Sequence, residues 1–128
     1  MNCLLDTNAF IWWHTDQPVF SSPATQALHN RDNALFLSVV SIWEIAIKMK
    51  LGKFSLIANL MDAVEKEARV NGLRILPIHA NHAIGTYDLP LHHKDPFDRL
   101  LIAQAQAERM TIITADSVFV RYGVKIVW

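Results

Sequence analysis

The segment Asn2-Cys3-Leu4-Leu5-Asp6 is a short apolar run that ends at a carboxylate. Four further short apolar runs follow, and longer segments with helical spacing of apolar residues lie between most of them. Short strands that alternate with helices are typical of an α/β fold with a parallel sheet. The five predicted strands are Asn2–Leu5, Ala34–Ser38, Arg74–Pro77, Thr111–Thr114 and Lys125–Val127.

Five longer segments carry apolar residues at helical spacing and are predicted to be helices. The segment Ser41–Lys50 is followed by Gly52, and the segment that ends at Val70 is followed by Asn71-Gly72. Glycine is a usual way for a helix to end, because it adopts the left-handed conformation without strain. The predicted helices are Pro23–Asn30, Ser41–Lys50, Leu56–Val70, His79–Tyr87 and Pro96–Arg109.

Length and composition favour a single domain over residues 1–128 with a substantial core, since 52% of the residues are hydrophobic and 19% are charged. Twelve basic and twelve acidic residues cancel, which excludes the overall basicity of many nucleic-acid-binding proteins and leaves such a role to a local site. The single cysteine, Cys3, excludes a disulfide framework. No segment approaches the roughly 18 apolar residues of a membrane span, so we expect a cytoplasmic protein with no membrane contact.

Two carboxylates follow predicted strands. Asp6 comes directly after Asn2–Leu5, and Asp116 follows Thr111–Thr114 almost as closely. The carboxyl ends of parallel strands meet at one edge of the sheet, and ligands bind there, in the crevice where the strand order reverses. We therefore expect these two carboxylates to face one another.

Glu44 and Asp98 lie near the starts of two predicted helices, and each has two interpretations. Ser41-Ile42-Trp43-Glu44 fits a capping box, in which Ser41 caps the helix and Glu44 bonds back to it. Asp95-Pro96-Phe97-Asp98 fits an ordinary helix start. The functional alternative is that a helix following a strand begins at that strand's carboxyl end. Acids in its first turn then project toward the rim where the strand-end acids lie.

Four carboxylates from four distant segments repel one another in one pocket, and divalent cations with oxygen ligands relieve that repulsion. Mg²⁺ or Mn²⁺ is the expected cofactor for such a set. Metal ions held in this way lower the pKa of a water molecule and stabilise the charged oxygens of a phosphodiester. We interpret four acids as metal ligands and catalytic, water-positioning groups: Asp6, Glu44, Asp98 and Asp116.

Four blocks of the sequence resemble, in order, those of the PIN-domain family, and more closely its VapC-type toxins. The first two blocks are Leu4-Leu5-Asp6-Thr7-Asn8 and Ser41-Ile42-Trp43-Glu44-Ile45-Ala46-Ile47-Lys48 with Leu51-Gly52-Lys53. The others are His93-Lys94-Asp95-Pro96-Phe97-Asp98-Arg99-Leu100-Leu101-Ile102-Ala103-Gln104-Ala105 and Thr114-Ala115-Asp116. All four stand in register with compatible spacing, and the resemblance covers essentially the whole chain.

The resemblance implies a three-layer α/β/α sandwich around a central parallel sheet, and an endoribonuclease that depends on Mg²⁺ or Mn²⁺. It also implies the toxin of a type II toxin–antitoxin system, which a cognate antitoxin protein neutralises, and a homodimer. The family's four acids fall on Asp6, Glu44, Asp98 and Asp116. Three residues match supporting positions, with capping or a strand end as the alternative role: Asn8, Thr114 and Asp95.

Several other residues have two interpretations. Five basic residues either form a margin around the acids that contacts RNA phosphates or belong to an ordinary solvated surface: Lys48, Lys50, Lys53, Lys94 and Arg99. In the second case Glu44 and Lys48 form an i,i+4 pair. Trp12 and Trp13 fit core packing or an apolar surface for a partner. The six histidines lack the ligand spacing of a zinc site, which favours loop and capping roles.

Three other functions are alternatives. A phosphate-ester hydrolase with an aspartate nucleophile after its first strand usually has a second acid two residues later, where this chain has Asn8. A receiver-like signalling module needs an aspartate after a central strand and a lysine after a late one, and neither Arg74–Pro77 nor Lys125–Val127 provides that arrangement. A binding module with a spent site is disfavoured because all four acids are present.

Overall fold

The structure, a computed structural model, describes residues 1–55 and 57–128. The strands are β1 (Asn2–Leu5), β2 (Ala34–Ser38), β3 (Arg74–Leu76), β4 (Thr111–Ile113) and β5 (Ile126–Val127). They form one parallel sheet in the order β3-β2-β1-β4-β5. The five predicted strands are confirmed, although β3 and β4 end one residue earlier and β5 begins one residue later than predicted.

The helices are α1 (Thr7–His14), α2 (Ser22–His29), α3 (Val39–Lys50), α4 (Leu60–Asn71), α5 (Ala80–Gly85), η1 (Thr86–Asp88), α6 (Pro96–Glu108) and η2 (Ser117–Tyr122). The predicted helices are confirmed with shifted ends, except that His79–Tyr87 divides into α5 and the 3-10 helix η1. The predicted start of the third helix, Leu56, lies outside the described residues, and α4 begins after its cap Asn59. The helices α1 and η2 are absent from the sequence prediction.

Asp6 explains why a helix follows β1 at once. Its carboxylate accepts a hydrogen bond from the backbone N–H of Ala9 at 2.7 Å, which makes Asp6 the N-cap of α1. An acid predicted for the functional site therefore also starts a helix.

Helix α3 begins two residues earlier than predicted. Ser38, the last residue of β2, accepts a hydrogen bond from the backbone N–H of Val40 at 3.1 Å and is the N-cap. The predicted capping box from Ser41 to Glu44 is therefore wrong, and Glu44 lies in the second turn of α3. The strand β2 runs into this helix without a connecting loop.

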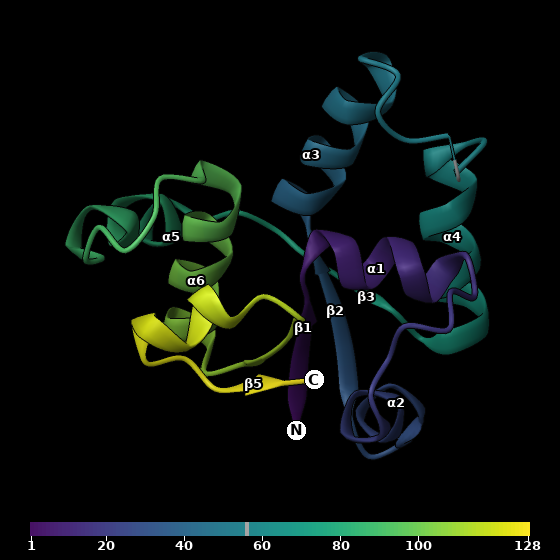
Figure 1. The fold of residues 1–128 in the computed structure, drawn as a ribbon, viewed down its shortest axis with the longest axis horizontal. Helices are drawn as coiled ribbons and strands as arrows, with labels where there is room; N and C mark the ends of the chain where they lie inside the picture. Colours follow the sequence, from purple (N-terminus) through teal and green to yellow (C-terminus); the bar gives the residue numbers. More distant parts are fainter. Residues whose placement is uncertain (56) are drawn as a thin grey trace.

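Helices cover both faces of the sheet, which confirms the predicted α/β/α sandwich (Figure 1). Side chains alternate along β1, so that Cys3 and Leu5 join one core cluster and Leu4 joins the other. The first cluster packs against α1, α2 and α4, to the right of the strands in Figure 1, and the second packs against α6 and η2. Helix α3 rises from the carboxyl edge and contributes to both clusters, through Ile45 and Val40.

The two neighbouring tryptophans of α1 are partly buried. Trp13 packs against the first core cluster, and the ring of Trp12 lies 5.8 Å from that of Trp128 between centroids. These contacts favour core packing over a free apolar surface. Among the helices of the described residues, none is long and apolar enough to cross a membrane.

Candidate active site

The order of the strands reverses between β1 and β4. From β1 the chain adds β2 and β3 on one side, then crosses over to add β4 and β5 on the other. The backbone N–H of Asp6 donates to the carbonyl of Ile113, the last residue of β4, at 3.1 Å. The crevice beside such a switch point is where open α/β sheets bind ligands. Asp6 and Asp116 both follow the strands that flank it.

Asp6 is a buried carboxyl with a perturbed acidity. Its side chain is 7% exposed, and burial raises its pKa from 3.8 to about 6. Hydrogen bonds from the Thr114 hydroxyl and the Ala9 backbone oppose this shift in pKa, whereas the charges of Asp116 and Glu44 add to it. The Thr114 oxygen also accepts the backbone N–H of Asp116 at 3.0 Å. Thr114 therefore links the two strand-end acids.

Glu44 approaches the same crevice from α3 and is also buried. Its Oε1 accepts a hydrogen bond from Thr7 Oγ1 at 2.6 Å, and its Oε2 accepts one from Lys48 Nζ at 2.5 Å. Thr7 Oγ1 also lies 3.0 Å from Ser41 Oγ, within hydrogen-bond distance. The predicted i,i+4 pair of Glu44 and Lys48 is confirmed, and both carboxylate oxygens of Glu44 are already hydrogen-bonded.

Asp98 enters from the first turn of α6. Burial raises its pKa from 3.8 to about 6, and the negative charges of Asp95 and Glu44 raise it further. A hydrogen bond from His93 lowers it, with His93 Nε2 at 3.2 Å from Asp98 Oδ2. Asp95 Oδ1 accepts the backbone N–H groups of Phe97 and Asp98, so Asp95 caps α6 as one interpretation predicted.

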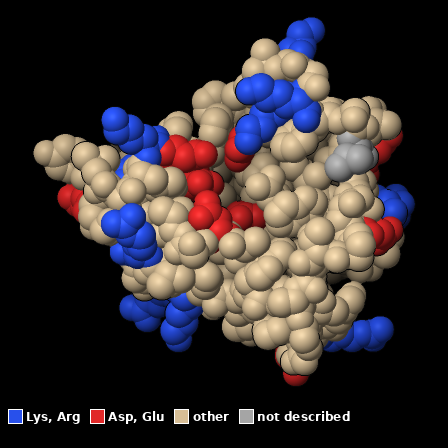
Figure 2. Space-filling view, in the orientation of Figure 1, with Lys and Arg blue, Asp and Glu red and all other residues tan. Residues whose placement is uncertain are grey.

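The four predicted acids thus form one electrostatic cluster. The charges of Asp116 and Glu44 raise the pKa of Asp6, and the charge of Glu44 raises the pKa of Asp98. Figure 2 shows acidic side chains in a hollow between α3 and α6, with basic side chains above it over α3. A donor set of carboxylate oxygens suits a hard divalent cation.

In residues 1–55 and 57–128, no three His, Cys, Asp or Glu side chains are already arranged to hold one metal ion. Each acid accepts a hydrogen bond from the protein, as Asp116 does from the backbone N–H of Val118 at 3.0 Å. The cluster nevertheless suits a divalent cation by charge and donor type.

Two other residues considered from the sequence, Asn8 and Arg99, make no hydrogen bond to an acid of the cluster within the described residues. Asn8 is exposed on the first turn of α1, and its supporting role stays a prediction. Arg99 donates instead to the backbone carbonyls of Thr86, Leu89 and Pro90 and to the hydroxyl of Tyr122. It therefore anchors the segment before α6.

Two polar residues that hydrogen-bond to the acids were not predicted from the sequence: Thr7 and His93. Thr7 and Ser41 meet only because α1 and α3 pack together. His93 reaches Asp98 because Tyr122, on η2, holds its Nδ1 at 2.6 Å. The nearness of His93 to Asp98 in sequence is the only local signal of these contacts.

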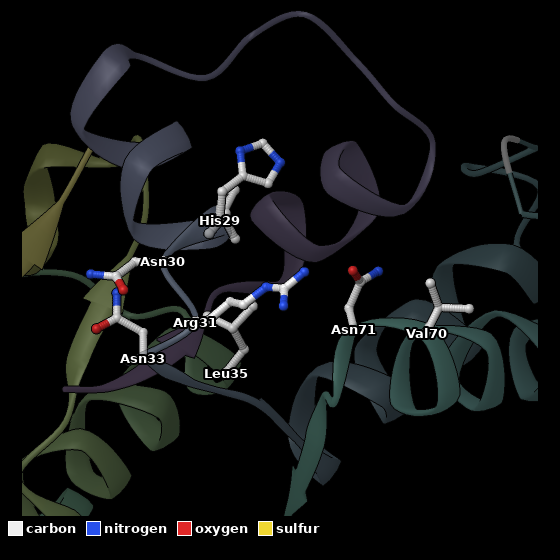
Figure 3. Close-up of a pocket in the computed structure, with 8 residues that line it drawn as sticks. His29, Asn30, Arg31, Asn33, Leu35, Val70 and Asn71 are labelled. Atoms are coloured by element: carbon white, nitrogen blue, oxygen red, sulfur yellow. The ribbon is translucent and has the colours of Figure 1, made fainter.

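A separate cavity of about 570 Å³ lies at the opposite, amino edge of the sheet (Figure 3). The end of α2, the loop that leads into β2 and the end of α4 supply most of its lining. Its polar side chains are His29, Asn30, Arg31, Asn33 and Asn71. Among the described residues that line it there is no carboxylate, in contrast to the acidic hollow.

Comparisons with known proteins agree with this architecture. A model of the PIN domain family matches residues 3–125. The structure of VapBC2 from Rickettsia felis, bound to a DNA fragment from its promoter, superposes with a TM-score of 0.74 at 18% identity, over 98% of this chain and 97% of that one.

DNA-bound VapBC from Salmonella typhimurium gives a TM-score of 0.70 at 18% identity, over 98% and 96% of the two chains. A toxin–antitoxin complex from Klebsiella pneumoniae gives 0.56 at 22% identity, over 90% and 87%. Among curated proteins, none matches the chain. At these identities the structural neighbours establish the fold.

Proposed function

The chain belongs to the PIN domain family, a family of nucleases, and we propose that it is an endoribonuclease dependent on Mg²⁺ or Mn²⁺. One observation carries this proposal: four carboxylates from β1, α3, α6 and the end of β4 share the crevice at the switch point of the sheet. Two of them have a raised pKa, mainly because they are buried, and the negative charges of neighbouring acids add to both shifts.

Asp6, Asp98 and Asp116 are the residues that would hold the cation. Glu44 completes the set from α3, although Thr7 and Lys48 already bind its two oxygens. A divalent cation bound there supplies Lewis acidity, which lowers the pKa of water and stabilises negative charge on phosphate oxygens.

The chain's own residues orient the reacting groups. Thr114 hydrogen-bonds to the side chain of Asp6 and to the backbone N–H of Asp116, which orients these two acids relative to each other. His93 hydrogen-bonds to Asp98 and orients its carboxylate. Lys48, held by Glu44 at the rim of the hollow, supplies positive charge to an approaching phosphodiester. Hydrolysis of a phosphodiester is the reaction that this arrangement supports best.

We further propose that the chain is the toxin of a VapC-type pair and that an antitoxin protein covers the acidic hollow. The support is the similarity in fold to VapBC and other toxin–antitoxin complexes. RNA as the substrate, a homodimeric state and a cytoplasmic location belong to the same proposal.

The test is cleavage of a bacterial RNA pool by the purified, folded chain with Mg²⁺ or Mn²⁺ and without copurified antitoxin. We expect discrete products that disappear with a chelator and in Asp6→Asn. The matched control is Asp32→Asn, which changes an exposed aspartate before β2, at the other edge of the sheet. Hydrolysis of small phosphate esters without RNA cleavage would favour a phosphatase instead.

A further inference from the structure

Two aromatic residues stand beside the acidic hollow. Trp43 on α3 and Phe97 on α6 are in contact, with ring centroids 5.4 Å apart and an interplanar angle of 68°. Each ring directly precedes an acid of the cluster, since Trp43 is followed by Glu44 and Phe97 by Asp98. The aromatic pair therefore bridges the two helices that deliver Glu44 and Asp98 to the crevice.

Trp43 is unusually exposed to solvent for a large aromatic residue. Its surface is 58% exposed, although a tryptophan in the free protein is normally well buried. Phe97, by contrast, is partly buried and packs against the second core cluster. Phe97 thus anchors one side of the indole through an edge-to-face contact, which aromatic pairs prefer, and most of the indole stays available. The result is a rigid, exposed aromatic surface at the edge of the hollow.

Positive charge lies near this aromatic surface. Lys48 and Lys50 occupy the last turn of α3, and Lys94 is exposed just before α6. In Figure 2, basic side chains over α3 border the acidic hollow. Exposed aromatic rings combined with basic side chains are what proteins use to bind single-stranded nucleic acid, by stacking on bases and contacting phosphates.

We propose that Trp43, backed by Phe97, stacks on an unpaired base of the RNA next to the phosphodiester that is cleaved. This inference rests on the proposed function. A base is joined to its own phosphate through one sugar, so a base on Trp43 holds that phosphate beside Glu44 and Asp98. Bases within a duplex are already stacked and paired, so the substrate is a single-stranded segment or a loop. Stacking tolerates every base, so the choice of RNA depends more on whether the segment is single-stranded than on which base it carries.

The first experiment measures binding separately from cleavage. A short single-stranded RNA with one 2-aminopurine is titrated in the Asp6→Asn background with Mg²⁺, and quenching of its fluorescence reports stacking. We expect Trp43→Ala to weaken binding by about tenfold or more and to abolish the quench, because stacking of one base contributes this much. Trp43→Phe, which keeps an aromatic face, retains most of both. The matched control is Tyr87→Ala, which removes an aromatic residue that is 90% exposed on η1.

The second experiment measures cleavage with Asp6 intact. We expect the wild type to cut a single strand faster than the same strand paired with its complement. We also expect Trp43→Ala to lose this preference, mainly through a higher KM. If Asp6- and metal-dependent cleavage persists and Trp43→Ala matches the wild type, the stacking proposal is wrong and the nuclease proposal stands. If Trp43-dependent quenching occurs without any cleavage, Trp43 does stack on a base, but the nuclease proposal is wrong, and so is the placement of that base beside a cleaved bond.

The oligomeric state separates an RNA subsite from a protein interface. If Trp43→Ala turns a dimer into a monomer in light scattering and leaves RNA binding unchanged, the ring contacts a second copy of the chain. That outcome would overturn the proposal.

Discussion

We predict that Asp6→Asn stabilises the metal-free protein at neutral pH. The folded protein raises the pKa of Asp6 from 3.8 to about 6. At about 1.4 kcal/mol for each pKa unit, the ionised carboxylate destabilises the fold by roughly 3 kcal/mol above pH 7. Asparagine removes the charge and keeps an oxygen for the cap of α1, but it serves the donors of Ala9 and Thr114 less well. We therefore expect a net gain of about 1–2 kcal/mol.

The sign of the pH dependence follows from the raised pKa. The wild type has its full stability below the ordinary pKa and loses it as the pH rises through about 6, whereas asparagine does not titrate. At pH 5 ionisation destabilises the wild type by only about half as much as above pH 7, or roughly 1–2 kcal/mol, which is close to the cost of the weaker hydrogen bonds of asparagine, so the advantage of Asp6→Asn should nearly vanish there. For a chain of this length, a gain of about 1–2 kcal/mol raises the midpoint of thermal unfolding by roughly 4–8 °C.

With Mg²⁺ bound, the wild type should become more stable than Asp6→Asn. A ligand at about 100 times its dissociation constant stabilises the folded state by about 2.7 kcal/mol, and only the wild type retains Asp6 as a ligand. The assay is thermal unfolding by circular dichroism at pH 5 and 7.5, with chelator or with Mg²⁺, and with Asp32→Asn as the control. A lower unfolding midpoint for Asp6→Asn in chelator at pH 7.5, or equal stabilisation of both proteins by Mg²⁺, would refute the reasoning.

Three further predictions concern the surroundings of the cluster. Mn²⁺ binding should weaken below about pH 6, because the ion must then displace protons from Asp6 and Asp98; equal calorimetric affinities at pH 5.5 and 7.5 would contradict this. Thr7→Val removes a donor to Glu44 and should lower the free energy of unfolding in urea by about 1–3 kcal/mol, whereas Thr7→Ser keeps the hydroxyl and should lose less. Arg99→Lys gives up hydrogen bonds to three backbone carbonyls, so amide hydrogen exchange in residues 86–90 should accelerate, and unchanged exchange would argue against that anchor.

The strand-end acids are the part of the site that the sequence predicts best. Asp6 and Asp116 follow short apolar runs, and the geometry of a parallel sheet brings such positions to one edge whatever the strand order is. The strand order itself is not a local property, because it depends on how the connecting helices pack on each face. The contacts of Glu44 with Thr7 and of Asp98 with His93 depend on that packing as well.

The errors in the sequence prediction also have local physical causes. Ser38 and Ser41 are both suitable caps, and the β-branched pair Val39 and Val40 between them favours continuation of a strand. The structure uses Ser38, which buries Val40 in the second core cluster. Helix α1 escaped prediction because its cap, Asp6, has a second interpretation as a site acid.

The central place of β1 in the sheet sets the order in which the site can assemble during synthesis. β2 follows β1 closely in the sequence and can pair with it early, whereas its other neighbour, β4, begins more than 100 residues after the end of β1. At typical translation rates of about 5–20 residues per second, this interval lasts roughly 5–20 s. A nascent or prematurely terminated chain that lacks β4 also lacks Asp116. The acidic crevice therefore closes only after β4 and Asp116 have left the ribosome, which delays any activity until then.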